Sequence, residues 1–120
     1  MKKYLLLFIS SIAILSCSNR ENTESKNIVI GAIMGNMADT FIKYIHDDLL
    51  EYSESKENIT ILIKDASGDA GIEQNLVENL ILQGVDGIML QLVNPETSRA
   101  IDDLAKQSNI PILYFNHRPK

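Results

Sequence analysis

Short polar side chains and one aromatic ring stand directly after the apolar runs that are expected to form strands. Asp39 and Phe41 follow the first run, and Asn116 follows the last. In open parallel sheets, ligands bind beside the carboxyl ends of the strands. A carboxylate and an amide can form hydrogen bonds there, and an aromatic ring can cover an apolar surface. These three residues are therefore the candidates for a ligand-binding site.

Each of these three candidates also has a purely structural alternative. Asp39 could cap the helix that follows it, and both roles are compatible only if different carboxylate oxygens serve them. Phe41 falls on an apolar helical stripe with Ile45, so core packing alone could explain it. Asn116 could form an Asx turn. The residue types alone leave these alternatives open.

The histidines and the adjacent aspartates of the first predicted helix have simple surface explanations. His46 falls on the polar side of that helix, and His117 falls in a predicted turn, so both are expected in solvent. Asp47 and Asp48 are neighbours in a helix and point about 100° apart. We therefore expect a solvated helix face rather than a catalytic pair of carboxylates.

The sequence carries no signature of an enzyme, a nucleotide cofactor or a metal site. No Gly-x-Gly-x-x-Gly follows the first apolar run, and no Gly-x-x-x-x-Gly-Lys-Ser/Thr loop occurs. No Ser or Cys nucleophile stands beside a plausible base. The spacing of Asp65, Asp69 and Asp86 matches no EF-hand loop, so capping or turn roles are expected for them. We expect neither catalysis nor a cofactor.

Apolar runs alternate with helical periods from residue 28 onward. The runs are rich in β-branched residues, and the first is almost continuously apolar, as in a strand buried on both faces. Four strands are predicted, at residues 28–34, 60–63, 87–92 and 112–115. Strict alternation with helices predicts an α/β fold, a doubly wound parallel sheet with its loops gathered along one edge.

Three amphipathic helices are expected between these strands. The first presents Phe41, Ile45, Leu49 and Tyr52 on one face, and the second presents Ile72, Leu76, Val77, Leu80 and Ile81. The second ends at Gly84, where a left-handed cap costs least. The third opens with Asn94-Pro95, a capping side chain followed by a residue already fixed at helical φ. It presents Ala100, Ile101, Leu104 and Ala105, and Pro111 prevents its continuation.

The chain begins with the pattern of a bacterial lipoprotein export signal. Lys2 and Lys3 precede a short apolar run, which is too short to span a membrane. A small residue then precedes Cys17, which we expect to be lipidated, so that residues 1–17 form the signal with its lipobox. The alternative is that Cys17 is incidental to an ordinary cleavable signal. Residues 18–27 are polar and are expected to form a linker.

The acidic charge of the chain argues against nucleic acid as a partner and against electrostatic attachment to membranes. The net charge is −5 with neutral histidines and becomes about −7 when Lys2 and Lys3 leave with the signal. An acidic surface of this kind is not expected to bind nucleic acid. Nor does it favour adhesion to anionic lipid, so membrane attachment is expected through Cys17 alone.

Four motifs occupy the predicted loop edge and the strands beside it. They are Ile30-Gly31 through Asp39-Thr40-Phe41, Gly84-Val85-Asp86-Gly87, Leu92-Val93-Asn94-Pro95, and Phe115-Asn116 before Pro119. Together they resemble the N-terminal part of the bacterial galactose/glucose-binding periplasmic proteins, the extracytoplasmic receptors of sugar ABC importers. The resemblance runs from about residue 28 to residue 119.

The resemblance implies a role for each candidate residue. Asp39 would accept hydrogen bonds from sugar hydroxyls, Phe41 would stack on one face of the pyranose, and Asn116 would supply an amide donor and acceptor. The chain departs from the family where it has Gly35-Asn36-Met37-Ala38 in place of Tyr-Lys-Tyr-Asp, and His117-Arg118 in place of Lys-Glu. The missing tyrosine at Gly35 removes a polar contact and is expected to leave room.

The resemblance also implies partners and a location. The expected ligand is a hexose, and the expected protein partners are the permease of an ABC transporter and a chemoreceptor, in the cell envelope. Because family members have two lobes, residues 28–120 are expected to form a partial N-terminal lobe, a truncated form that binds weakly alone. The alternative is a membrane-tethered interaction lipoprotein of the same fold that carries no sugar.

Overall fold

A computed structural model describes residues 26–119 of the chain. The expected signal at residues 1–17, its Cys17 and most of the expected linker lie outside the described residues. Strands and helices alternate along the described residues without exception. In the described part of the chain, no helix is both long and apolar enough to cross a membrane.

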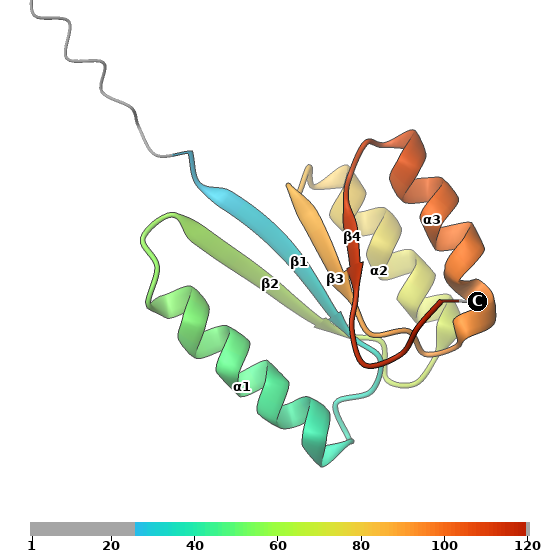
Figure 1. The fold of residues 1–120 in the computed structure, drawn as a ribbon, viewed down its shortest axis with the longest axis horizontal. Helices are drawn as coiled ribbons and strands as arrows, with labels where there is room; N and C mark the ends of the chain where they lie inside the picture. The colour runs from blue at the N-terminus through green and yellow to red at the C-terminus, as the bar shows by residue number, and fades with distance from the viewer. Residues whose placement is uncertain (1–25, 120) are drawn as a thin grey trace, which may run out of the picture.

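Four parallel strands form one sheet in the order β2-β1-β3-β4 (Figure 1). Their bounds are Ile28–Met34 (β1), Ile59–Asp65 (β2), Gly87–Leu90 (β3) and Ile112–Tyr114 (β4). The predicted parallel α/β sheet is therefore confirmed. β3 ends two residues earlier than predicted because Gln91 and Leu92 leave the sheet and enter the loop at its carboxyl edge.

Helices cover both faces of this sheet (Figure 1). The helix α1 (Thr40–Glu54) packs on one face, whereas α2 (Ala70–Leu82) and α3 (Ser98–Gln107) pack on the other, and a short 3₁₀ turn, η1 (Pro95–Thr97), leads into α3. Each face of the sheet has its own hydrophobic core. Successive residues of β1 point into one core and then the other, because side chains alternate across a strand. Ile33 joins the core under α2 and α3, while Ala32 and Met34 join the core under α1.

The buried face of α1 differs from the predicted one at both ends. Ile42 is fully buried, with Ile45 and Leu49 packed beside it. Phe41 and Tyr52 are instead 56% and 48% exposed. Residues 42, 45 and 49 follow the i, i+3, i+7 spacing of one helical face, and residue 41 lies about 100° away from residue 42. The prediction that Phe41 and Tyr52 pack on the sheet is therefore wrong.

The predicted end of α2 is confirmed in detail. Gly84 has a φ of +71°, its N–H donates to the Ile81 carbonyl at 3.0 Å, and the Val85 N–H donates to the Leu80 carbonyl at 3.4 Å. This pair of bonds is a Schellman cap, which satisfies carbonyls that the helix end would leave without partners. Of the remaining predicted core positions, Ile72 and Ala100 are exposed.

Candidate functional site

A cleft of about 300 Å³ lies at the carboxyl edge of the sheet. The loops after all four strands contribute to it, as expected for an open parallel sheet. Its lining residues are Gly35, Asn36, Asp39, Gly68, Gln91, Leu92, Val93 and His117. A second hollow, of about 330 Å³, is lined mainly by apolar side chains toward the opposite ends of the strands. The cleft is the better candidate site because several polar groups converge on it.

Asp39 caps α1 and also lines the cleft. Its Oδ1 accepts a hydrogen bond from the Phe41 N–H at 2.8 Å and so caps α1. The same side chain lines the cleft. Within residues 26–119, Oδ2 makes no hydrogen bond, which leaves one carboxylate oxygen available to a ligand. The capping role is therefore confirmed, and ligand binding by the other oxygen stays a prediction.

Phe41 and Asn116 lie near the ends of their elements but do not line the cleft. Phe41 is in the first turn of α1 and is largely exposed. Asn116 follows β4 with a φ of +63°, a conformation that asparagine tolerates better than most residues. The His117 N–H donates to the Phe115 carbonyl across it at 2.7 Å, closing a tight turn. Their contact with a ligand stays a prediction.

His117 has a defined partner, although the sequence indicated only a solvated turn. Its Nδ1 lies 2.8 Å from the Leu92 carbonyl oxygen, and the residue lines the cleft. A carbonyl only accepts hydrogen bonds, so Nδ1 carries the proton. In the neutral ring, Nε2 is then an acceptor. His117 therefore joins the loop after β4 to the loop after β3 at the cleft.

Gln91 contributes to the cleft in a way that the sequence did not reveal. It is only 5% exposed, and its Oε1 accepts from the Gly35 N–H at 2.9 Å. A Cβ atom on Gly35 would lie 3.0 Å from the Gln91 carbonyl oxygen. The room expected beside Gly35 is therefore partly filled by Gln91. Only the parallel pairing of β1 with β3 brings these two residues together.

Glu73 is a buried carboxylate behind the cleft. It is fully buried on α2, and it binds the Val93 N–H at 2.6 Å and the Thr97 hydroxyl at 3.2 Å. Burial raises the pKa of Glu73, against the smaller opposing effects of these two hydrogen bonds. The sequence does carry a signal for this burial. Residue 73 lies on the same i, i+4, i+7 helical stripe as Val77 and Leu80, which face the core.

Asp65 and Asp69 have the turn and capping roles that were expected, whereas Asp86 binds the neighbouring strand β1 instead. Asp65 accepts from the backbone N–H groups of Met37 and Ser67, at 3.1 and 2.8 Å. Asp69 caps the N-terminus of α2, and Asp86 accepts from a β1 backbone N–H. Among residues 26–119, no group of three or more His, Cys, Asp or Glu side chains could hold a metal ion.

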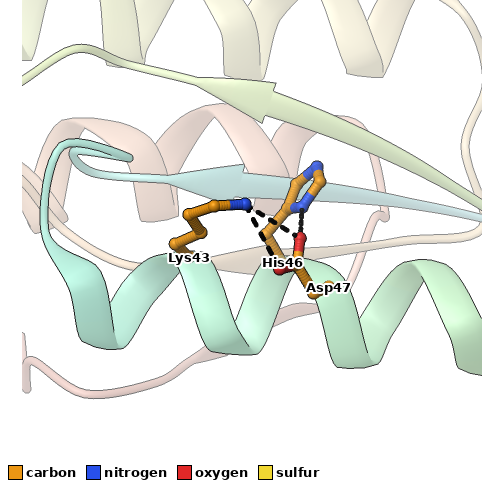
Figure 2. A network of polar contacts seen from close by, with 3 residues as sticks. All are labelled: Lys43, His46 and Asp47. Carbon is orange, nitrogen blue, oxygen red and sulfur yellow. Dashed lines mark hydrogen bonds and ion pairs between the residues drawn. The ribbon is translucent and has the colours of Figure 1, made fainter.

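Lys43, His46 and Asp47 form a polar cluster on α1 (Figure 2). None of the three lines the cleft. Asp47 accepts from His46 Nδ1 at 2.8 Å and from Lys43 Nζ at 3.2 Å. The hydrogen bond from His46, and then that from Lys43, lower the pKa of Asp47. The side chain of His46 is only 24% exposed, so it is less solvated than expected. Asp47 and Asp48 are both exposed, as predicted.

The comparisons with known proteins agree on one family. The profile of a family described as periplasmic binding protein domain matches residues 30–120. A putative rhizopine-binding protein of Rhizobium meliloti is 26% identical over 99% of this chain. The D-galactose/methyl-galactoside binding periplasmic protein MglB of Haemophilus influenzae is 27% identical over 99% of this chain.

The fold agrees with that of a solved ABC transporter solute-binding protein from Bacillus halodurans, which holds bound myo-inositol. The two share 27% identity and a TM-score of 0.74 over 81% of this chain. This chain covers 33% of that structure and 36% of each of the two relatives named above. It therefore spans about one third of the length of these proteins.

Proposed function

Because the chain belongs to the periplasmic binding protein domain family, we propose that it forms one wall of a binding site for a cyclic polyol. The family consists of solute-binding proteins rather than enzymes and acts outside the cytoplasm. The proposed ligand class comprises hexoses, including galactose and glucose, and inositols. The proposed task is that of the substrate-binding component of an ABC importer. The cleft at the carboxyl edge of the sheet is the observation that carries this proposal.

The polar groups of the cleft suit the hydroxyl groups of a polyol. Asp39 offers a carboxylate oxygen, and His117 offers Nε2 as an acceptor when neutral. Gln91 uses its Oε1 on Gly35 and makes no further side-chain hydrogen bond within the described residues, so its amide N–H groups remain available as donors. A polyol hydroxyl both donates and accepts, and this mixture of donors and acceptors can serve it.

Phe41 and Asn116 are proposed as contacts at the rim of the same site. The family resemblance assigns stacking to Phe41 and a paired donor and acceptor to Asn116. The Phe41 ring is exposed, so its face is available to the C–H surface of a ring-shaped ligand. The inclusion of inositols is supported by the bound myo-inositol of the Bacillus halodurans protein. D-galactose is supported by the name of the Haemophilus influenzae relative.

Calorimetric titration with D-galactose, D-glucose and myo-inositol tests the proposal. We expect saturable but weak binding to at least one of them, in the millimolar range, because one wall provides only part of the contacts. Asp39→Asn should weaken that binding about tenfold, since an amide replaces the charged acceptor. Asp48→Asn on the solvated face of α1 is the matched control and should change nothing. Equal affinities for the two variants would refute the assigned role of Asp39.

The proposed function includes a lipid anchor and two protein partners. We propose that Cys17 carries the lipid and that the permease of an ABC transporter, and a chemoreceptor, receive the ligand-loaded protein. Mass spectrometry of the chain from the membrane fraction should find residue 17 as a diacylated N-terminus. Cys17→Ser should release the chain from the membrane. Recovery of the unmodified chain with residues 1–16 still attached would contradict the anchor.

A further inference from the structure

We propose that Glu73 is a positioning residue of the cleft, which fixes the Leu92–Val93 peptide and through it His117. No part of Glu73 lines the cleft, so it can act on a ligand only through other residues. The effect on ligand affinity rests on the proposed function, whereas the effect on the peptide does not.

Glu73 holds the loop after β3 mainly through Oε1, because the single proton of the Thr97 hydroxyl also has the Asn94 carbonyl oxygen at 2.7 Å. Oε1 accepts from the Val93 N–H at 2.6 Å, and Oε2 lies 3.2 Å from Thr97 Oγ1 at the end of η1. Leu92 and Val93, two of the residues of this loop, line the cleft. Glu73 belongs to α2, so its hydrogen bonds tie the loop after β3, and with it one wall of the cleft, to that helix.

The bond to Val93 also sets the direction of the neighbouring carbonyl. The peptide is trans, and in a trans peptide the N–H and C=O groups point in opposite directions. The Leu92 carbonyl therefore points away from Glu73, and it accepts the hydrogen bond from His117 Nδ1 at 2.8 Å. One peptide plane is thus held from behind by Glu73 and from the cleft side by His117.

This arrangement fixes the protonation pattern of His117 as well as its place. As long as the Leu92 carbonyl faces it, the ring must keep its proton on Nδ1, and Nε2 stays an acceptor. If the peptide turned, this constraint would be lost and the ring could adopt either neutral tautomer. Glu73 therefore governs the hydrogen-bonding character of a cleft residue without touching it.

Two Glu73 variants and one control test the proposal by NMR at about pH 8, where an ordinary histidine is neutral. Glu73→Leu removes both acceptors. We expect the Val93 amide to exchange at least about tenfold faster and the ¹⁵N shifts of His117 to move from the Nδ1-protonated tautomer toward a mixture. Glu73→Gln keeps one acceptor but binds the Val93 N–H more weakly, so it should move the Val93 and His117 signals in the same direction as Glu73→Leu, by a smaller amount. Glu78→Gln, on the same helix, should leave both signals unchanged.

The same variants separate this proposal from the proposed function. If no polyol binds the unaltered chain but Glu73→Leu shifts Val93 and His117, the polyol proposal fails and the positioning role stands. Unchanged exchange and tautomer in a folded Glu73→Leu chain would overturn the positioning role. If that variant does not fold, Glu73→Gln decides: a weaker bond to the neutral amide should move the Val93 and His117 signals together, and a change confined to Val93 would overturn the proposal.

Discussion

At the scale of single residues, the side chains that line the cleft also make hydrogen bonds that stabilise the fold. Asp39 caps a helix with one oxygen and presents the other, and Gln91 binds Gly35 through its oxygen and keeps its amide N–H groups. Sequence reasoning found Asp39 because it follows the first strand directly. It could not find the hydrogen-bond partners of Gln91 and Glu73, because these partners lie 56 and 20 residues away and come close only in the folded chain.

Asp39→Asn and Asp39→Ala separate the two roles of this carboxylate. Asparagine is as good a cap as aspartate, so Asp39→Asn should change the free energy of unfolding by less than about 0.5 kcal/mol. Asp39→Ala removes the acceptor for the Phe41 N–H and should cost about 1 kcal/mol. Urea denaturation followed by circular dichroism gives both values. Equal losses in the two variants would show that the capping bond does not stabilise α1.

The buried carboxyl group of Glu73 predicts a pH dependence of stability. Its folded pKa is raised above the ordinary value of 4.5, so the folded state holds its proton more tightly than the unfolded state. The resulting stabilisation is complete below that value and is lost as the pH rises through the folded pKa. The stability of the unaltered chain relative to Glu73→Gln, which does not titrate, should therefore fall with increasing pH.

The groups around Glu73 permit a clean measurement of this effect. Val93 and Thr97 bind it from the loop after β3. Tyr114 of β4 is close enough to feel its charge and donates to Asp102 of α3 at 2.7 Å. Burial raises the pKa of Tyr114, and the hydrogen bond to Asp102 raises it further. The phenol therefore stays neutral over the acid range. Urea denaturation at a series of pH values tests the prediction, and a constant or increasing difference would contradict it.

At the scale of elements, the sequence predicts strand type and helix ends better than helix faces. β1 occupies the predicted residues, and Gly84 caps α2 as predicted, because both signals are local in the sequence. Phe41 was placed on the wrong face of α1, since one residue of offset in a helix rotates a stripe by about 100°. β3 is shorter than its apolar run, because Leu92 is buried in a loop rather than in the sheet.

Gly84→Ala measures the contribution of the cap of α2. A Cβ atom there would meet nothing within 4 Å, so the cost is that of a φ of +71° in a residue with a side chain. We expect a loss of about 1 kcal/mol in the free energy of unfolding. Gln83→Ala, at the neighbouring exposed position, should change it by less than about 0.5 kcal/mol. If Gly84→Ala were neutral, the left-handed cap would not be contributing to stability.

At the scale of the whole molecule, one side of the sheet carries exposed apolar surface. β4 is an edge strand of the described sheet, and Leu113 within it is 60% exposed. The apolar hollow near the opposite ends of the strands also includes Ile30, Met89 and Leu113. Unpaired strand edges with apolar side chains favour association between molecules. We therefore expect self-association at high concentration.

Leu113→Lys should weaken this association, because a charge on an edge strand opposes pairing with a second strand. Leu82→Lys is the control, since Leu82 is 84% exposed at the end of α2, away from that edge. Sedimentation velocity over a range of concentrations should show less self-association for Leu113→Lys and no change for Leu82→Lys. Equal effects of the two substitutions would point to net charge rather than to the edge of β4.

The central claim, that the carboxyl edge of the sheet binds a cyclic polyol, is tested most directly by an NMR titration of the ¹⁵N-labelled chain with myo-inositol and with D-galactose. We predict saturable, fast-exchange shifts that converge on the cleft, at Gly35, Asp39, Gln91 and His117, with a dissociation constant in the millimolar range. The absence of any saturable shift would contradict the claim. So would shifts confined to the apolar hollow around Ile30, Met89 and Leu113.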